Sequence, residues 1–171
     1  MEVLVVRHAH AGSKEEWDGD DRLRPLSDRG RSEAMGVADA LTPYAPRRIV
    51  SSPYLRCLQS VQPLAQRLAV RVEESELLVP DAGRRAAAFV RALARQDDGP
   101  VVVCTHGETI EVLQKRIVQS SKLPFEPGGP HEKGSTWVLR AKKGRFVRAE
   151  YLPPARPWCR SPAVCHPADA G

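Results

Sequence analysis

The chain has 171 residues, 42% of them hydrophobic and 27% charged, which is the composition of one globular domain with a full core. Its 26 basic and 21 acidic residues give a net charge of +5, which suits an anionic substrate. The sequence contains neither a common nucleic-acid-binding motif nor an apolar segment long enough for a signal peptide or a membrane span. We therefore expect a cytoplasmic protein that binds neither nucleic acid nor membranes, and the sequence leaves its oligomeric state open.

The first half of the chain begins with a strand, a loop and a helix. The short apolar run at residues 3–6 is typical of a buried strand. The polar loop from Gly12 to Leu26 follows it, and a loop of that length in a compact domain indicates a functional role beside the substrate. Ser27 is expected to cap a helix whose apolar residues recur at helical spacing.

A second strand and helix follow in the same order. Residues 48–51 predict the strand, and Pro53 is expected at the first position of the helix. The first turn of this helix carries Arg56. Pro63 should kink or shorten the helix, because proline lacks the N–H that the helical ladder needs.

The second half continues this alternation and ends in a hairpin. The predicted elements are a strand at 70–73, a helix around 86–93, a strand at 101–105, a helix from about Glu108, a loop at 122–132, and paired strands at 135–141 and 145–152. This order predicts an α/β fold, a three-layer α/β/α sandwich with a mostly parallel central sheet. We expect one domain over residues 1–152 and a proline-rich, disordered tail over 153–171.

Charged and titratable side chains follow the predicted strands directly. Arg7 and His8 end the first strand, Arg56 follows the second, and His106 follows the strand at 101–105. In open α/β sheets, ligands bind just beyond the carboxyl ends of such strands. Arginine matches phosphate oxygens with a planar fork of donors, and a neutral imidazole can attack phosphorus. The combination predicts a site for phosphoryl transfer.

Four segments, in this order, resemble the histidine phosphatase superfamily: Arg7–Ala11, Arg24–Gly30, Ser51–Arg56 and Thr105–Glu108. The nearest branch is that of the SixA-type phosphohistidine phosphatases. The chain is also similar to the phosphatase-like domain behind the Nudix domain of mycobacterial MutT-type proteins, through segments 12–14, 19–21 and 133–137. The resemblance covers residues 1–152 and implies a phosphoglycerate mutase-like fold.

The resemblance implies a role for five residues. His8 would be the nucleophile and would become a phosphohistidine that water then hydrolyses. Arg7, Arg56 and His106 would surround the phosphoryl oxygens, and the hydroxyl of Ser13 would donate a further hydrogen bond. The substrate would be a phosphorylated small molecule, such as a phosphomonoester or nucleotide, or a phosphohistidine protein, and no cofactor is expected.

The sequence leaves open which residue is the general acid. Cleavage of a phosphoester expels an alkoxide that a carboxylic acid usually protonates. In many relatives this acid lies after the third strand, where Asp81 is the first candidate and Glu76 is the second. The third possibility is that all four acids of the segment, Glu73, Glu74, Glu76 and Asp81, are solvated surface charges. An acid at Asp81 would favour phosphoesters. Its absence would favour phosphohistidine, whose leaving imidazole can already carry a proton.

Two rival functions come from other classes of protein. His8 and His10 form a His-x-His pair as in some metal-dependent hydrolases, but the chain is too short for their barrel fold and the neighbouring arginines would repel a cation. Cys159, Cys165 and His166 match no standard zinc pattern, so no metal is expected. The other rival is a regulatory relative that recognises phosphate without turnover.

Overall fold

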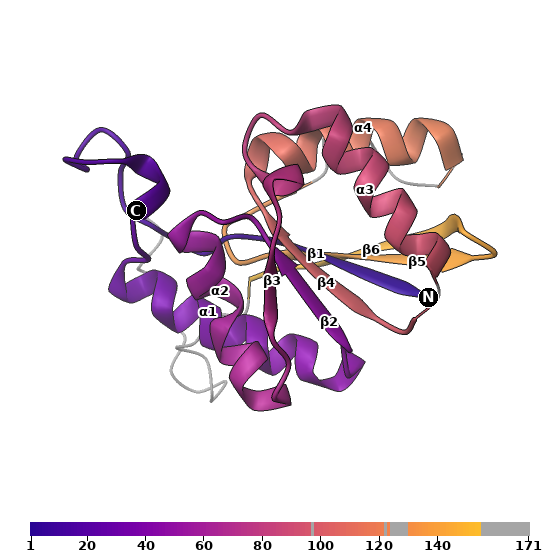
Figure 1. Ribbon diagram of the computed structural model, residues 1–171, viewed down its shortest axis with the longest axis horizontal. Helices are drawn as coiled ribbons and strands as arrows, with labels where there is room; N and C mark the ends of the chain where they lie inside the picture. The colour runs from indigo at the N-terminus through magenta and orange to yellow at the C-terminus, as the bar shows by residue number, and fades with distance from the viewer. Residues whose placement is uncertain (97, 122, 124–129, 155–171) are drawn as a thin grey trace, which may run out of the picture.

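The computed structural model describes residues 1–96, 98–121, 123 and 130–154. In this part of the chain six strands form one sheet, and two helices cover each of its faces (Figure 1). The strands are β1 (Glu2–Arg7), β2 (Arg48–Ser51), β3 (Val72–Glu74), β4 (Val101–Thr105), β5 (Thr136–Lys142) and β6 (Arg145–Leu152). The helices are α1 (Asp28–Leu41), α2 (Leu55–Leu68), α3 (Gly83–Gln96) and α4 (Gly107–Ser121).

The sheet has the order β3-β2-β4-β1-β5-β6. The first four strands of this order are parallel, whereas β5 pairs antiparallel with β1 and β6 antiparallel with β5. Helices α1 and α2 lie on one face, and α3 and α4 lie on the other (Figure 1). The predicted three-layer α/β/α sandwich with a mostly parallel sheet is therefore confirmed.

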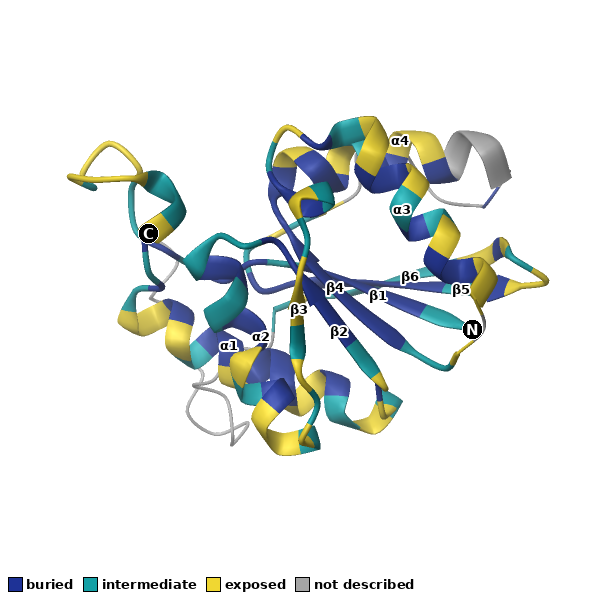
Figure 2. Ribbon diagram, in the orientation of Figure 1, coloured by how far each residue is buried: buried dark blue, intermediate teal, exposed yellow. Residues whose placement is uncertain are grey.

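The alternation of side chains along β1 divides the core between the two faces. Val3 and Val5 pack with α3 and α4, whereas Leu4 and Val6 pack with α1 and α2. All five residues of β4 are buried, as expected for a central strand covered on both faces (Figure 2). Burial on both faces explains why the sequence of these strands is a continuous apolar run.

Helix α1 begins as the sequence predicts. Ser27 is its N-cap, and the Ser27 hydroxyl accepts a hydrogen bond from Gly30 N. Gly30 lies against the segment that follows β1, because a Cβ at this position would be only 1.9 Å from the His10 carbonyl oxygen. The same oxygen accepts a hydrogen bond from Ser27 N at 3.0 Å. The absence of a side chain at Gly30 is therefore required by this close approach.

Helix α2 differs from the prediction at its start and around its proline. Ser52 N still donates to Cys104 O, so the pairing with β4 extends past β2 and the helix begins only at Leu55, with Tyr54 as N-cap. Pro53 therefore lies before the N-cap and is not the first helical residue. Pro63 lies inside α2, which continues to Leu68, so the proline does not shorten the helix.

The third strand begins two residues later than predicted. Helix α2 ends with Ala69 in the left-handed region, and Val70 N donates to Ala65 O, so Val70 belongs to the helix end. The apolar run that follows β3 is a short 3-10 turn at Glu76–Leu78, because Ser75 caps it through Leu77 N. A second 3-10 turn, Thr42–Tyr44, follows α1 directly.

The terminal hairpin has the predicted position. Strands β5 and β6 pair around Lys143 and Gly144, which both have positive φ values. The predicted loop at 122–132 lies mostly outside the described residues, and so does the predicted tail except for Pro153 and Pro154. No helix in the described part of the chain is long and apolar enough to cross a membrane.

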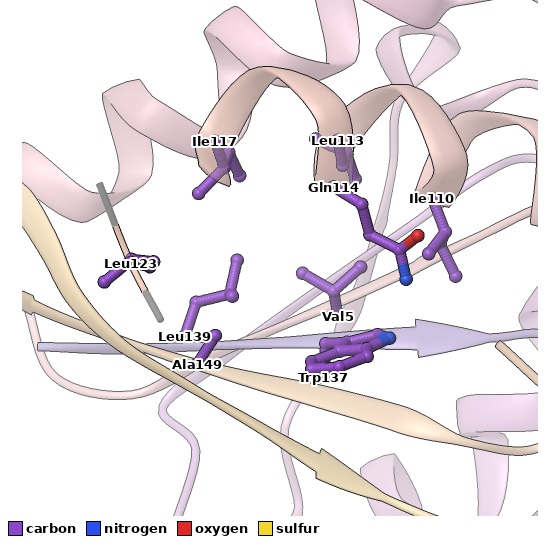
Figure 3. A pocket seen from close by; sticks show the side chains of 9 residues that line it. All are labelled: Val5, Ile110, Leu113, Gln114, Ile117, Leu123, Trp137, Leu139 and Ala149. Carbon is purple, nitrogen blue, oxygen red and sulfur yellow. The ribbon is translucent and has the colours of Figure 1, made fainter. Parts of the chain in front are cut away.

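A small apolar cavity lies between α4 and the sheet (Figure 3). Its volume of about 20 Å³ has room for about one water molecule. Ile110, Leu113 and Ile117 of α4 line it on one side, and Val5, Trp137 and Leu139 of the sheet line it on the other. This cavity is a local gap in the core around α4.

Candidate active site

A second, polar cavity of about 360 Å³ lies at the carboxyl ends of β1 and β4. Its lining brings together residues of five separate segments: Arg7, His8, Gly12, Ser13, Lys14, Glu15, Asp21, Arg24, Arg56, Pro80, His106, Glu108 and Lys133. Four predicted site residues, Arg7, His8, Arg56 and His106, are among them, as is Ser13. The loop from Gly12 to Leu26 supplies six lining residues, so it borders this cavity.

The imidazole of His8 is buried and held in one tautomer. Its Nδ1 lies 2.8 Å from the Ala9 carbonyl oxygen, which can only accept, so Nδ1 carries the hydrogen and Nε2 has a free lone pair. Burial, reinforced by the charges of Arg56 and Arg7 and partly offset by the Ala9 hydrogen bond, lowers the pKa of His8 to about 3. His8 is therefore neutral near pH 7, the state that a nucleophile requires.

The ring of His106 lies edge-on to that of His8, with the two centroids 5.2 Å apart. Its Nε2 lies 2.9 Å from Ser52 Oγ, and its Nδ1 lies 3.5 Å from a terminal nitrogen of Arg56. Burial, His8 and Arg56 together lower the pKa of His106 to about 2, so this ring is also neutral when no anion is bound. Since Arg56 can only donate, His106 donates from Nε2 to Ser52.

Arg7 and Arg56 each leave one buried donor unused. The Nε atoms of both side chains are buried and have no hydrogen-bond partner within the described residues. Arg7 lies against Gly107, where a Cβ would be 3.0 Å from its Cζ atom, and donates from Nη1 to His131 O at 2.6 Å. Unpaired buried donors are rare in proteins, and a bound anion is one of the partners that can satisfy them. The two arginines therefore have donors available for an anion in the cavity.

Asp21 holds the terminal nitrogens of Arg56. Its carboxylate lies 3.0 Å from Arg56 Nη2 and 2.8 Å from Arg24 Nε, and its carbonyl oxygen accepts from Arg56 Nη1 at 2.7 Å. Although burial opposes ionisation, the bonds and charges of Arg24 and Arg56 hold the pKa of Asp21 below its usual range. Arg24 also donates to Ala11 O and Gly12 O, so it ties the two ends of the loop together.

The Tyr54 ring connects the loop to the site. Arg56 lies over it at 4.6 Å from the ring centroid, Arg22 lies over it at 5.3 Å, and His106 meets it edge-on at 4.8 Å. Arg22 also forms an ion pair with Glu76. These contacts place a loop residue, Arg22, and two site residues around one aromatic ring.

The structure does not bring the predicted acids into the cavity. Asp81 is exposed at the tip of the turn that Ala82 N closes with Val79 O, and only its neighbour Pro80 lines the cavity. Glu76 is bound by Arg22 at the surface. Ser13 does reach the cavity, but its hydroxyl donates to Glu15 at 2.6 Å.

Glu108 is a carboxylate at the cavity, for which the sequence favours the start of a helix over a role in orienting His106. It lies in the first turn of α4, lines the cavity, and forms no hydrogen bond or ion pair with the described residues. The other two lining carboxylates, Glu15 and Asp21, are bound by Ser13 and by the two arginines. The sequence signal that could have identified Glu108 is its position two residues after His106.

Lys133 and Arg24 also line the cavity without having been predicted as site residues. Lys133 lies just before β5, which runs antiparallel to β1, so the amino end of β5 meets the carboxyl end of β1. A search of carboxyl strand ends alone therefore misses Lys133. A predicted pairing of β5 with β1 would have revealed it.

The two histidines of the His-x-His pair have different surroundings. His8 lines the cavity, whereas His10 Nδ1 is hydrogen-bonded to Ser27 Oγ at 2.8 Å, and His10 does not line the cavity. Among the described residues, no group of three or more His, Cys, Asp or Glu side chains is arranged to hold a metal ion.

Comparison with known proteins gives a family and several relatives. A family model described as the histidine phosphatase superfamily (branch 1) matches residues 3–79. An 8-oxo-(d)GTP phosphatase of Mycolicibacterium smegmatis is 36% identical over 156 residues, which are 89% of this chain and 48% of the relative. The chain thus spans about half the length of that protein.

Solved structures show the same fold at low sequence identity. The protein histidine phosphatase SixA complexed with tungstate has a TM-score of 0.74 and 21% identity, over 90% of this chain and 97% of that one. A putative phosphohistidine phosphatase SixA from Nakamurella multipartitia has a TM-score of 0.73 and 21% identity, over 91% and 96%. The family model covers the segment that carries His8 and Arg56, and the solved structures share the fold over about nine tenths of this chain, so the resemblance to the histidine phosphatase superfamily is confirmed.

Proposed function

We propose that this protein is a phosphatase that works through a phosphohistidine intermediate on His8 and hydrolyses a phosphohistidine or a small phosphomonoester or nucleotide. One arrangement carries the proposal: a neutral His8 with a free Nε2 shares a cavity with two arginines whose buried Nε donors are unpaired. A nucleophile and spare donors for oxyanions are the two requirements of phosphoryl transfer.

The family and its phosphatase-named members support a hydrolase that acts on phosphate esters. The substrate classes named above fit the relatives, one of which is an 8-oxo-(d)GTP phosphatase and another a protein histidine phosphatase. The proposed location is cytoplasmic, and the free, buried thiols of Cys57 and Cys104 suit a reducing compartment.

In the first step, Nε2 of His8 attacks phosphorus, a P–N bond forms, and the bond from phosphorus to the leaving group breaks. The proton on Nδ1 stays hydrogen-bonded to Ala9 O, which stabilises the positive charge that develops on the ring. Arg7 and Arg56 bind the three phosphoryl oxygens as charge spreads over them. Binding of a dianion also favours the protonated form of His106, which then donates to an oxygen.

In the second step, water attacks the phosphohistidine from the side that the leaving group has vacated. The P–O bond forms as the P–N bond breaks, which returns a neutral His8 and releases inorganic phosphate. The same arginines hold the same oxygens in both steps, so one set of donors serves both transition states.

Glu108 is the lining carboxyl best placed to serve as the acid and then the base. Protonated, it gives its proton to a leaving alkoxide in the first step, and ionised, it takes a proton from water in the second. The support is its position at the cavity without a partner among the described residues. Asp81 is less suited, because it lies outside the cavity lining, although both carboxylates are exposed.

Rapid quench with a ³²P-labelled substrate tests the proposal. Wild-type protein should accumulate an acid-labile, base-stable phosphoryl adduct that maps to His8, and His8→Ala should lose both the adduct and turnover. His10→Ala is the matched control, since His10 does not line the cavity. Turnover by the wild type without such an adduct, at adequate time resolution, would reject His8 as the nucleophile. Absence of turnover on any phosphate ester would favour the phosphate-recognising, non-catalytic alternative.

A further inference from the structure

Lys133 presents a positive charge that forms no ion pair with the described residues, although the charge of the nearby Glu33 partly offsets the arginines around it. Its side chain is half-buried and lines the polar cavity, yet it forms no hydrogen bond or ion pair with any described residue. Burial, followed by the charges of Arg7 and Arg24, lowers the pKa of Lys133. Placing an ammonium beside two guanidinium groups is unfavourable unless an anion binds between them.

The backbone fixes Lys133 at this position. Gly134 N lies 3.2 Å from Arg7 O and 3.3 Å from His8 O, so the residue after Lys133 is hydrogen-bonded to the end of β1. Ser135 O accepts from Arg7 N at 3.0 Å and continues the pairing. Lys133 is therefore held beside Arg7 by the sheet and is not a freely placed surface lysine.

The other cations of the cavity are already engaged. Arg7 donates to His131 O, Arg24 donates to Asp21 and to two carbonyl oxygens, and Arg56 is held by Asp21. The remaining positive charges in the lining are Lys133 and Lys14, and Lys14 extends from the loop at the exposed rim. Neither is needed to hold the cavity together.

The charge of Lys133 acts on both histidines that follow β1. Among charged neighbours it has the largest effect on the pKa of His10, whereas for His8 the effects of Arg56 and Arg7 are both larger. Arg7 in turn is the charged neighbour with the largest effect on Lys133. Since Gly134 is hydrogen-bonded to the end of β1, Lys133 lies on the side of the cavity where Arg7 ends that strand.

We infer that Lys133, with Lys14 at the rim, binds a second phosphate group of the substrate, next to the phosphoryl group that His8 receives. The substrate class is a diphosphate or triphosphate ester, such as a nucleoside diphosphate, in which two phosphates share one bridging oxygen. Such a chain places a second anion beside the first, as the neighbouring positions of Arg7 and Lys133 require. The cavity volume of about 360 Å³ leaves space for both groups.

This inference rests on the proposed phosphatase function and sharpens it. In hydrolysis of a diphosphate, His8 Nε2 attacks the terminal phosphorus, the P–O bond to the bridging oxygen breaks, and the nucleoside monophosphate leaves. Water then releases the terminal phosphate from His8. A phosphohistidine residue has a single phosphate and would leave the Lys133 site without its ligand.

The experiment compares GDP with GMP as substrates for four forms of the protein. Wild type should prefer GDP, and Lys133→Met should lower the ratio of kcat/KM for GDP to kcat/KM for GMP by roughly 10- to 100-fold, the loss of one charge-assisted hydrogen bond. Lys133→Arg should keep most of the ratio because it keeps the charge. Lys142→Met is the matched control, since it removes the same charge from the exposed hairpin and should leave the ratio unchanged.

Other outcomes overturn the inference. A wild type that turns over GMP but not GDP, or a Lys133→Met variant with an unchanged ratio, would show that Lys133 does not bind a second phosphate. Competition supplies a measurement independent of turnover: methylenediphosphonate should bind more weakly to Lys133→Met than to wild type, and by a larger factor than inorganic phosphate does. If no ester is hydrolysed, the proposed function fails while this comparison still decides the role of Lys133.

Discussion

The polar and apolar cavities share strand β1 and helix α4 but have opposite characters. Val5 and Ile110 line the apolar cavity, and only a few residues away Arg7, His8 and Glu108 line the polar one. Their volumes are about 20 Å³ and about 360 Å³. The same two elements thus supply the core at one end and charged groups at the other.

The difference teaches how to separate a packing gap from a binding site in this molecule. Enclosure by apolar side chains marks the smaller cavity (Figure 3). The larger one is distinguished by charged groups that have no partner among the described residues: the Nε donors of Arg7 and Arg56, the Glu108 carboxylate and the Lys133 ammonium. Substitutions should therefore affect activity at one cavity and stability at the other.

After loss of the nucleophile His8, the largest expected effect on activity is at Glu108. Glu108→Gln should lower kcat for GMP, whose leaving group is a basic alkoxide, by roughly 10²- to 10⁴-fold, the usual contribution of general acid catalysis. It should have little effect on 4-nitrophenyl phosphate, whose leaving group needs no proton. Asp81→Asn is the control outside the cavity, and steady-state kinetics on both substrates measures the contrast. The opposite pattern, with loss at Asp81 only, would return the role of acid to Asp81.

Substitutions of Arg7 and Arg56 should have the next largest effect on activity. Arg7→Ala and Arg56→Ala should each lower kcat by roughly 10²- to 10³-fold, as does loss of one donor to a transition-state oxyanion. Lysine should restore little at either position, because it lacks the planar fork. Arg67→Ala, in the same helix as Arg56 but paired with Asp39 at the surface, is the control. Equal activity of the lysine and arginine forms would mean that only net charge matters.

At the apolar cavity we expect a substitution to lower stability and to leave activity nearly unchanged. Leu113→Ala should enlarge it and lower the free energy of unfolding by about 2–5 kcal/mol, the usual cost of truncating a buried leucine. Activity measured well below the melting temperature should stay within about twofold of wild type. Urea unfolding and kinetics on the same preparation test both parts. A large loss of activity in folded protein would show that the two cavities are coupled through α4.

The smallest expected effect concerns pH and stability. Folding lowers the pKa of His8 to about 3 and of His106 to about 2, from 6.5, so between these values the unfolded chain binds more protons than the folded one. Stability is therefore fully present above pH 6.5 and falls as the pH drops, by about 1.4 kcal/mol per histidine from pH 7.5 to 5.5. His8→Gln should remove its share of this loss in urea unfolding at the two pH values. A variant with the wild-type slope would contradict the lowered pKa.

Much of this molecule could be predicted from its sequence because local signals agree with the tertiary structure. The apolar run at 3–6, the cap at Ser27 and the turn at Lys143 and Gly144 each depend on neighbours in the chain, and each appears where expected. The errors arise where a distant pairing decides the boundary. Ser52 pairs with Cys104 and delays α2, a contact that no local pattern contains.

The residues of the site likewise divide into those that the sequence predicts and those whose position depends on a distant strand pairing. His8, Arg7, Arg56 and His106 follow strands that are parallel neighbours, so the carboxyl-end rule predicts that they meet. Lys133 precedes an antiparallel strand, and its role depends on the pairing of β5 with β1. The sequence places Asp81 after an apolar run that resembles a strand, but that run is a 3-10 turn capped by Ser75, and Asp81 lies exposed before α3.

The contact between Gly30 and His10 sets a limit on how this protein can vary. Every amino acid except glycine would push a Cβ into the carbonyl oxygen of His10, at 1.9 Å. Two stretches of backbone meet there, and neither can relieve the clash by changing a rotamer. Redesign of α1 is therefore free at its exposed positions but fixed at this one, since moving the helix outward would shift the segment that begins with the reactive histidine.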